Sequence, residues 1–228
     1  MSADFNIIDN NEQFIVVEKP PGISFQDEEG QTGFFNQIKK RLNAGELYPV
    51  HRLDKLTSGL VIMAKTKDAA RTFQQLFETR QIEKYYLALS LDKPKKKQGL
   101  IKGDMEKSRR GTWKLARECN NPAITQFFSY GIEGKARLFL LKPHTGKTHQ
   151  LRVALKSIAS PIAGDTAYNG KTSDRGYLHA FAMRFVFDGM VYDYLCHPTS
   201  GELFNELAVR QKIAELSPPW LQIWPKLK

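Results

Sequence analysis

The sequence of 228 residues contains little cysteine, and its only two, Cys119 and Cys196, lie far apart. This excludes the C-x-x-C pairs of structural zinc sites and the cysteine framework of small secreted domains. We therefore expect a chain from a reducing, cytoplasmic compartment. Its length is sufficient for an apolar core, since a chain of this size buries roughly 70% of its unfolded surface.

Long apolar runs are also missing. No uncharged stretch approaches the ~18 residues of a membrane span, so we expect no membrane partner. The first thirty residues hold seven acids and one base, which fits neither a secretory signal nor a transit peptide.

Motifs for nucleotides and metals are absent from the sequence. Thr145-Gly146-Lys147-Thr148 lacks the earlier glycine of a phosphate-binding loop, because Leu141 occupies that position. No Rossmann glycine pattern occurs, and the five histidines are scattered without ligand spacing. We expect no metal site.

Acidic residues are fewer than basic ones, 24 against 34, which gives a net charge of +10. The excess is concentrated in residues 93–117, hereafter the basic segment, with ten basic and two acidic residues. Such a concentration favours a polyanionic partner such as nucleic acid. The alternative is a solvated basic face without a partner.

The hydrophobic spacing predicts an α+β fold, with a mostly antiparallel sheet and flanking helices. Asp188-Gly189 between two β-rich runs indicates a hairpin, 131–134 a turn, and 93–99 an exposed loop. Strands are expected at 6–8, 14–18, 48–53, 59–66, 82–91, 125–130, 137–141, 183–187 and 190–196, and helices at 34–42, 68–79, 148–158 and 205–216.

One segment, His51 to Leu60, places a carboxylate where a strand meets a turn. Asp54 lies two residues after Arg52, so in an extended chain the two side chains point to the same side. An acid presented in this way can act as nucleophile or base. From the residues alone, a turn aspartate paired with a nearby basic residue is the favoured interpretation.

His51-Arg52-Leu53-Asp54 followed by Thr57-Ser58-Gly59 resembles the catalytic motif of the RluA-type pseudouridine synthases. The resemblance extends from about Ile15 to Leu203. Further segments that are similar to family motifs, in the family's order, are Lys19-Pro20-Pro21-Gly22, Lys84-Tyr85-Tyr86-Leu87-Ala88, Thr145 to Val153, Pro161 to Asp165, Leu178-His179-Ala180 and His197-Pro198.

The resemblance implies an RNA uridine isomerase that uses no cofactor and no metal, with an active-site cleft across the sheet. Asp54 would be its catalytic carboxylate, and Arg152 would be the basic residue that pairs with this carboxylate. An opposite charge nearby lowers the pKa of a carboxyl group and keeps it ionised. Tyr86 would stack on the target uracil. Tyr85 would point to the opposite face of its strand.

Substrate-binding roles are implied for four more residues. Leu178 would line the uracil pocket, the alternative being plain core packing. Arg52, two residues from the catalytic acid, would fill the gap left by a flipped base, contact phosphate or form a salt bridge. His51 lies in the same motif. Lys147 stands where the family usually has arginine, which keeps the charge and loses the forked donor.

The implied partner is structured RNA, either ribosomal or transfer RNA. We expect residues 1–228 to form a single catalytic domain without a separate N-terminal RNA-binding domain, able to act as a monomer with no obligate protein partner. Trp113 could stack on a base. The candidates for the RNA backbone in the basic segment are Lys95, Lys96, Lys97, Lys107, Arg109, Arg110 and Lys114.

Two other functions compete with this one. The first is an RNA-binding protein that has lost catalysis, which the joint presence of Asp54, Tyr86 and Arg152 disfavours. The second is an unrelated carboxylate-dependent hydrolase of small molecules, disfavoured by the charge and by the lack of a second paired acid.

Overall fold

The computed structural model describes residues 5–133 and 136–227. The chain forms two compact units. The first unit comprises Met1–Glu83 and Ala180–His197, and the second comprises Lys84–His179 and Pro198–Lys228. The chain passes from one unit to the other within β5 (Glu83–Ser90), within β11 (Leu178–Phe187) and between His197 and Pro198.

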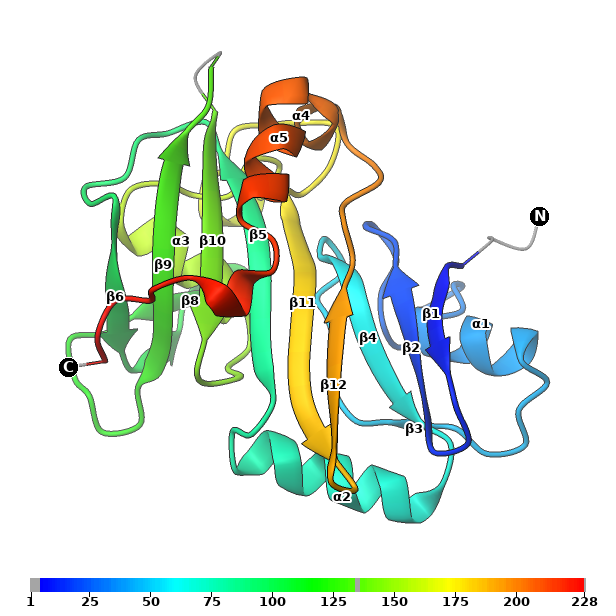
Figure 1. Ribbon diagram of the computed structural model, residues 1–228. Helices are drawn as coiled ribbons and strands as arrows, with labels where there is room; N and C mark the ends of the chain where they lie inside the picture. The colour runs from blue at the N-terminus through cyan, green and yellow to red at the C-terminus, as the bar shows by residue number, and fades with distance from the viewer. Residues whose placement is uncertain (1–4, 134–135, 228) are drawn as a thin grey trace. The chain divides into compact units, whose positions relative to one another are not determined.

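The first unit is a mostly antiparallel sheet with helix α2 (Lys67–Glu78) packed against it (Figure 1). Phe73 of α2 contacts Phe14, Phe185 and Phe187 of the sheet, with ring centroids 4.9–5.5 Å apart. These aromatic contacts form part of the core of the unit, with the buried aliphatic side chains of β2 and β4. Its elements are β1 (Ile7–Asn10), β2 (Phe14–Lys19), α1 (Phe34–Arg41), β3 (Tyr48–Pro49), β4 (Ser58–Ala64), α2 (Lys67–Glu78), β11 from Ala180 onwards and β12 (Met190–Leu195).

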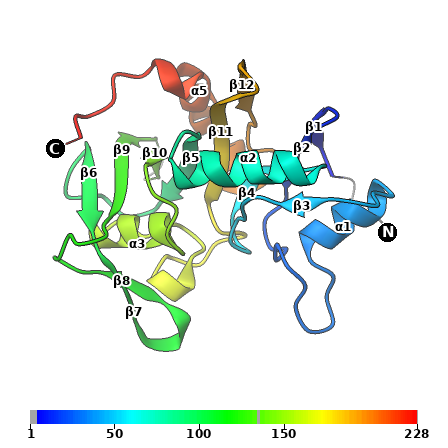
Figure 2. The ribbon, with the colours of Figure 1, turned by 90° about the horizontal axis from the view of Figure 1, so that it is seen from below.

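The second unit has a sheet in the order β5–β10–β9–β6, again antiparallel. Helix α3 lies on one face, and the C-terminal segment crosses the other, as Figures 1 and 2 both show. The remaining elements are β6 (Gln98–Gly103), β9 (Ala123–Gly131), β10 (Arg137–Pro143), α3 (Gln150–Ser157), η2 (Thr166–Tyr168), α4 (Glu202–Asn205), α5 (Leu207–Glu215) and η3 (Pro219–Leu221).

A small hairpin interrupts the basic segment and was not predicted from the sequence. β7 (Met105–Lys107) pairs with β8 (Trp113–Leu115) around the turn η1 (Arg109–Gly111). Figure 2 shows this hairpin projecting beside α3. The predicted loop at 93–99 is also shorter than expected, because Gln98 and Gly99 already belong to β6.

The predicted fold class is confirmed: the sheet is mostly antiparallel with flanking helices. Asp188 and Gly189 form the expected two-residue hairpin turn, both with positive φ. The predicted turn at 131–134 includes Gly134, which lies outside the described residues.

Three predicted elements are wrong in their extent. The strand expected at 183–187 begins at Leu178, because its first six residues are all buried and show no alternation. The strand expected at 48–53 ends at Pro49, because the His51 side chain takes the N–H of Ile62 that a longer strand would have paired. The helix expected at 205–216 is divided at Glu206, whose ψ of 132° is extended. In the described part of the chain, no helix is long and apolar enough to cross a membrane.

Candidate active site

Asp54 lies in a tight turn directly before the fully buried strand β4. The backbone N–H of Thr57 donates to the Asp54 carbonyl oxygen at 3.0 Å and closes the turn. Thr57 and Ser58 are buried, whereas Asp54 is only partly buried. The residues that anchor the turn are therefore buried, whereas Asp54 itself stays partly accessible.

A buried cation fixes this turn from below. Lys19, at the end of β2, is fully buried, and its Nζ donates to the carbonyl oxygens of Thr57 at 2.9 Å and Lys55 at 3.3 Å. It also donates to Pro20 at 3.0 Å, while the Gly22 N–H donates to Lys55 at 2.8 Å. The Lys-Pro-Pro-Gly motif thus holds the Asp54 turn through main-chain carbonyls.

Steric contact fixes the other end of the turn. Gly59 has φ +105°, and a Cβ placed there would lie 2.2 Å from the carbonyl oxygen of Ala180. Only glycine allows so close an approach. His51 is tied to the same strand, because its Nε2 accepts the Ile62 N–H at 2.9 Å and its ring lies 5.0 Å from that of Phe77.

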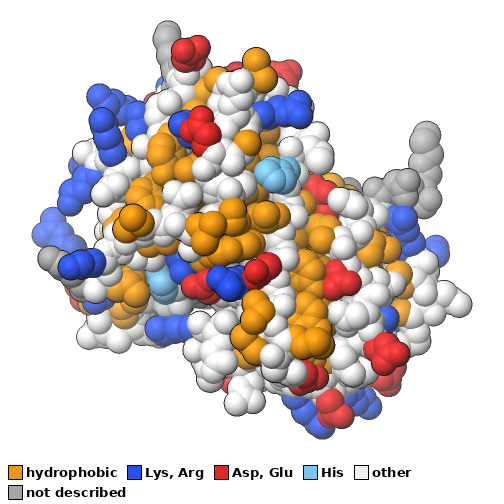
Figure 3. All heavy atoms as spheres, in the orientation of Figure 1, with side chains coloured by type: hydrophobic (Ala, Val, Ile, Leu, Met, Phe, Trp, Pro, Cys, Tyr) orange, Lys and Arg blue, Asp and Glu red, His pale blue; other side chains and the backbone are white. Residues whose placement is uncertain are grey.

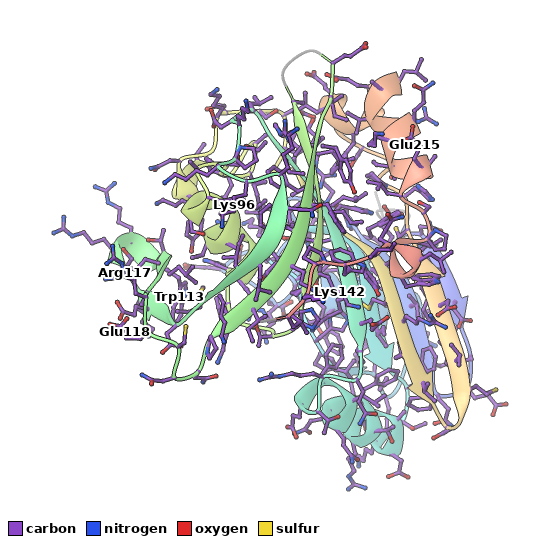
Figure 4. The ribbon with its side chains drawn as sticks, turned by 60° about the vertical axis from the view of Figure 1, so that its left-hand side comes forward. Lys96, Trp113, Arg117, Glu118, Lys142 and Glu215 are labelled. Atoms are coloured by element: carbon purple, nitrogen blue, oxygen red, sulfur yellow. The ribbon has the colours of Figure 1, made fainter. Side chains whose placement is uncertain are left out.

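The alternation of β5 separates two adjacent tyrosines, as predicted. Tyr85 is fully buried, with its ring 5.7 Å from Trp224 and 5.0 Å from the Lys142 Nζ. Tyr86 is partly exposed on the other face. Lys84 shares that face with Tyr86, and burial lowers the pKa of its ammonium group. Figure 4 shows Lys142 beneath the C-terminal segment.

Arg152, in the first turns of α3, is a buried guanidinium with a carboxylate partner. Its Nε and Nη2 donate to the two carboxylate oxygens of Asp165 at 2.7 and 2.8 Å. This forked geometry is the strongest form of ion pair. Asp165 belongs to the segment Pro161 to Asp165, which is similar to a family motif, but the sequence assigns no role to this residue. The contact between Asp165 and Arg152 therefore joins two of the matched motifs.

The Thr145–Gln150 loop before α3 is fastened to β9. The Gln150 Oε1 accepts from the Thr145 hydroxyl at 2.7 Å and the Lys147 N–H at 3.0 Å. Its Nε2 donates to the Ile124 carbonyl oxygen and the Thr125 hydroxyl. Gln150 thereby fixes the backbone of Lys147, which is partly exposed.

The other predicted residues differ in accessibility. Arg52 is exposed, whereas Leu178, at the start of β11, is buried. In the basic segment, Lys114 forms an exposed ion pair with Glu106 at 2.9 Å. Figure 3 shows Lys and Arg side chains gathered along the left-hand edge of the face in view. All ten cations of the segment are exposed, among them the predicted RNA-backbone candidates Lys95, Lys96, Lys97, Lys107, Arg109, Arg110 and Lys114.

The structure therefore places His51, Arg52 and Asp54 in the first unit, and Tyr86, Lys147, Arg152 and Leu178 in the second. Within the first unit, the motif of Asp54 is joined to that of Lys19. The pairing of Asp54 with Arg152 remains a prediction. In the described residues, no group of three or more His, Cys, Asp or Glu side chains has a metal-binding arrangement.

The matched motifs that carry Asp54, Tyr86 and Arg152 all point to one class of protein. The family model described as RNA pseudouridylate synthase matches residues 13–157. The chain belongs to this family and is of the RluA type, so it is an RNA isomerase.

Its relatives support the same assignment. The chain is 45% identical over 221 residues to an uncharacterized RNA pseudouridine synthase of Haemophilus influenzae, covering 96% of this chain and 99% of the relative. It is 32% identical to the dual-specificity RNA pseudouridine synthase RluA of Escherichia coli, covering 71% and 76%. The solved human RNA pseudouridylate synthase domain containing 4 is similar at 25% identity, with TM-score 0.70 and coverage of 87% and 89%.

Proposed function

We propose that this protein isomerises a specific uridine to pseudouridine in structured ribosomal or transfer RNA of the cytoplasm, with Asp54 as the catalytic carboxylate. The observation that carries the proposal is the Asp54 turn. Its backbone is fixed by the buried Lys19 and by the close approach of Gly59 to Ala180, and its carboxylate stays partly exposed. A fixed, accessible acid suits attack on a bound nucleotide.

In the reaction, the bond between uracil N1 and ribose C1′ breaks, the uracil turns, and a bond between C5 and C1′ forms. The C5 proton leaves and N1 is protonated, so the atoms of the product equal those of the substrate. An ionised Asp54 serves this chemistry either by attack on C1′ or by removal of a sugar proton. Both routes need an unprotonated carboxylate, and Arg152 is the cation proposed to favour that form.

A uridine in a stem or loop must leave its stack before this chemistry, at a cost of a few kcal/mol. Tyr86, partly exposed on β5, is proposed to stack on the flipped uracil. The exposed Arg52 beside Asp54 is proposed to fill the vacated space or to contact phosphate. Leu178, Lys147 and His51 are proposed to complete the substrate-binding surface.

The test of this function is Asp54→Asn, which keeps the shape of the side chain and removes its charge. The assay is release of tritium from RNA labelled at uracil C5, because that hydrogen is lost as the new bond forms. We expect at least about a thousand-fold slower release with RNA binding retained. Asp68→Asn, which changes an exposed acid on α2, is the matched control. An active Asp54→Asn variant would contradict the role of Asp54.

The RNA itself is identified by mapping pseudouridines in ribosomal and transfer RNA from cells with and without this protein. We expect one or a few sites to disappear in its absence. If every pseudouridine persists and the purified protein modifies neither RNA class, the proposed substrate is wrong.

The exposed cations of the basic segment are proposed to bind the RNA backbone. Replacing Lys95, Lys96 and Lys97 by alanine should weaken binding and flatten its salt dependence. The logarithmic slope should fall by roughly 0.7–0.9 for each phosphate that the variant no longer neutralises. Alanine at Lys39 and Lys40 of α1 serves as the control. An unchanged slope would mean that the segment is only a solvated surface.

A further inference from the structure

Tyr168 is a fully buried tyrosine that no sequence argument singled out. It ends the short helix η2, and its backbone N–H donates to the Asp165 carbonyl oxygen at 3.0 Å. The turn has no space for a side chain at either of its two glycines. A Cβ at Gly164 would lie 1.8 Å from the carbonyl oxygen of Arg175, and a Cβ at Gly170 would lie 1.9 Å from the carbonyl oxygen of Ile162. Tyr168 is therefore held in a rigid turn.

The ring of Tyr168 supports Arg152. The guanidinium carbon lies 4.7 Å from the ring centroid, and the same guanidinium forms its two hydrogen bonds with Asp165. Asp165 and Tyr168 are three residues apart in one short turn, where side chains at this spacing point the same way. A single turn thus contacts Arg152 through a carboxylate and an aromatic face.

The hydroxyl of Tyr168 contacts two other elements of the second unit. It accepts the backbone N–H of Trp113, the first residue of β8, at 2.9 Å. It also lies 2.8 Å from the Nδ1 of His149, which precedes α3. Figure 4 shows Trp113 on the hairpin that carries much of the basic segment. One side chain therefore touches both the hairpin and Arg152.

We propose that Tyr168 is a positioning residue for the reaction, which fixes Arg152 with its ring and the RNA-docking β7–β8 hairpin with its hydroxyl. This inference rests on the proposed function of both elements. A buried ring in a rigid turn has little freedom to move. The hydroxyl should therefore affect RNA binding, and the ring should affect the chemical step.

The experiment separates the hydroxyl from the ring. Tyr168→Phe removes only the hydroxyl, and Tyr168→Leu removes the aromatic face as well. Tyr177→Phe is the matched control, because Tyr177 is also fully buried in the second unit and its hydroxyl also accepts a backbone N–H, that of Leu203, at 2.9 Å. Tritium release under single turnover is measured against RNA concentration, with total RNA from cells lacking the protein as substrate.

For Tyr168→Phe we expect the RNA concentration at half-maximal rate to rise about fivefold, the usual effect of removing one hydrogen bond. The saturating rate should change less than about twofold. Tyr168→Leu should also lower the saturating rate, by about tenfold or more. Hydrogen exchange of the peptide containing Trp113 should accelerate in Tyr168→Phe and stay unchanged in Tyr177→Phe.

The proposal is overturned if Tyr168→Phe and Tyr177→Phe share the same RNA dependence and the same exchange at Trp113. Tyr168 would then be an ordinary packing residue. If Tyr168→Leu does not fold, the phenylalanine variant and the exchange measurement still decide. A wild-type protein that releases no tritium from any RNA contradicts the proposed function instead, and the exchange result remains readable without activity.

Discussion

The Asp54 turn of the first unit and the Arg152 site of the second both hold a charged side chain, but by different means. At Asp54, Lys19 and Gly59 fix the backbone of the turn. At Arg152 they reach the charged group itself, through Asp165 and the ring of Tyr168. The first arrangement leaves Asp54 partly exposed, and the second immobilises the guanidinium of Arg152. This difference suits the proposed roles of Asp54 as the reactive acid and of Arg152 as its counter-charge.

The largest expected effect tests the second arrangement. Asp165→Asn keeps the shape of the side chain and removes the carboxylate charge that pairs with the buried Arg152. Breaking one partner of a buried pair costs about 3–5 kcal/mol. We expect a loss of this size in the free energy of unfolding, measured in urea. A loss below about 1 kcal/mol would mean that Arg152 does not depend on Asp165.

The next effect tests the first arrangement. Lys19→Met keeps the length of the side chain and removes the donor from the carbonyls of Thr57, Lys55 and Pro20. We expect a loss of roughly 2–3 kcal/mol, since hydrogen bonds to charged groups are worth about 1.5–3 kcal/mol each and do not add. Activity should fall further than stability explains, because the Asp54 turn loosens. Unchanged activity in the folded fraction would contradict the role of Lys19.

A pH effect is expected in the second unit. Burial and the hydrogen bond to Asp174 raise the pKa of Tyr177 to about 12 from its usual 10. A raised pKa stabilises the fold below pH 10, and this contribution is lost as the pH rises through 12. The wild-type melting temperature should therefore fall more than that of Tyr177→Phe between pH 10 and 12, by a few degrees. Parallel curves would contradict the shift.

The smallest effect is expected at the surface of the Asp54 turn. Lys55 pairs with Glu28 at 2.7 Å, with about half of each side chain exposed. Such pairs contribute about 0–1 kcal/mol, so Lys55→Met should change stability far less than Lys19→Met. Equal losses in the two variants would mean that burial is not what makes Lys19 effective.

Much of this molecule was predictable from local pattern. The period of two on β5 separates Tyr85 from Tyr86, and Asp188-Gly189 gives its hairpin, because both features depend on neighbouring residues. The family resemblance identifies the motifs that contain Lys19 and Asp165, but it does not predict which atoms these two side chains contact. Lys19 reaches a carbonyl 38 residues away and Arg152 a carboxylate 13 residues away, and such contacts are set by the tertiary fold.

Two misses have local physical causes. The β7–β8 hairpin lies among cations that hide its alternation, so the segment resembles a loop. The strand after Tyr48 stops early because a His51 side chain replaces a backbone acceptor for Ile62, a substitution that hydrophobic spacing does not reveal.

The turn that holds Arg152 has a consequence for entropy. A free arginine side chain carries about 2 kcal/mol of rotamer entropy, which is lost when the group is ordered. Here Asp165 and Tyr168 order the guanidinium during folding, before any RNA arrives. RNA binding then loses no side-chain entropy at Arg152. At 1.4 kcal/mol per factor of ten, the saving corresponds to roughly thirty-fold in affinity or rate.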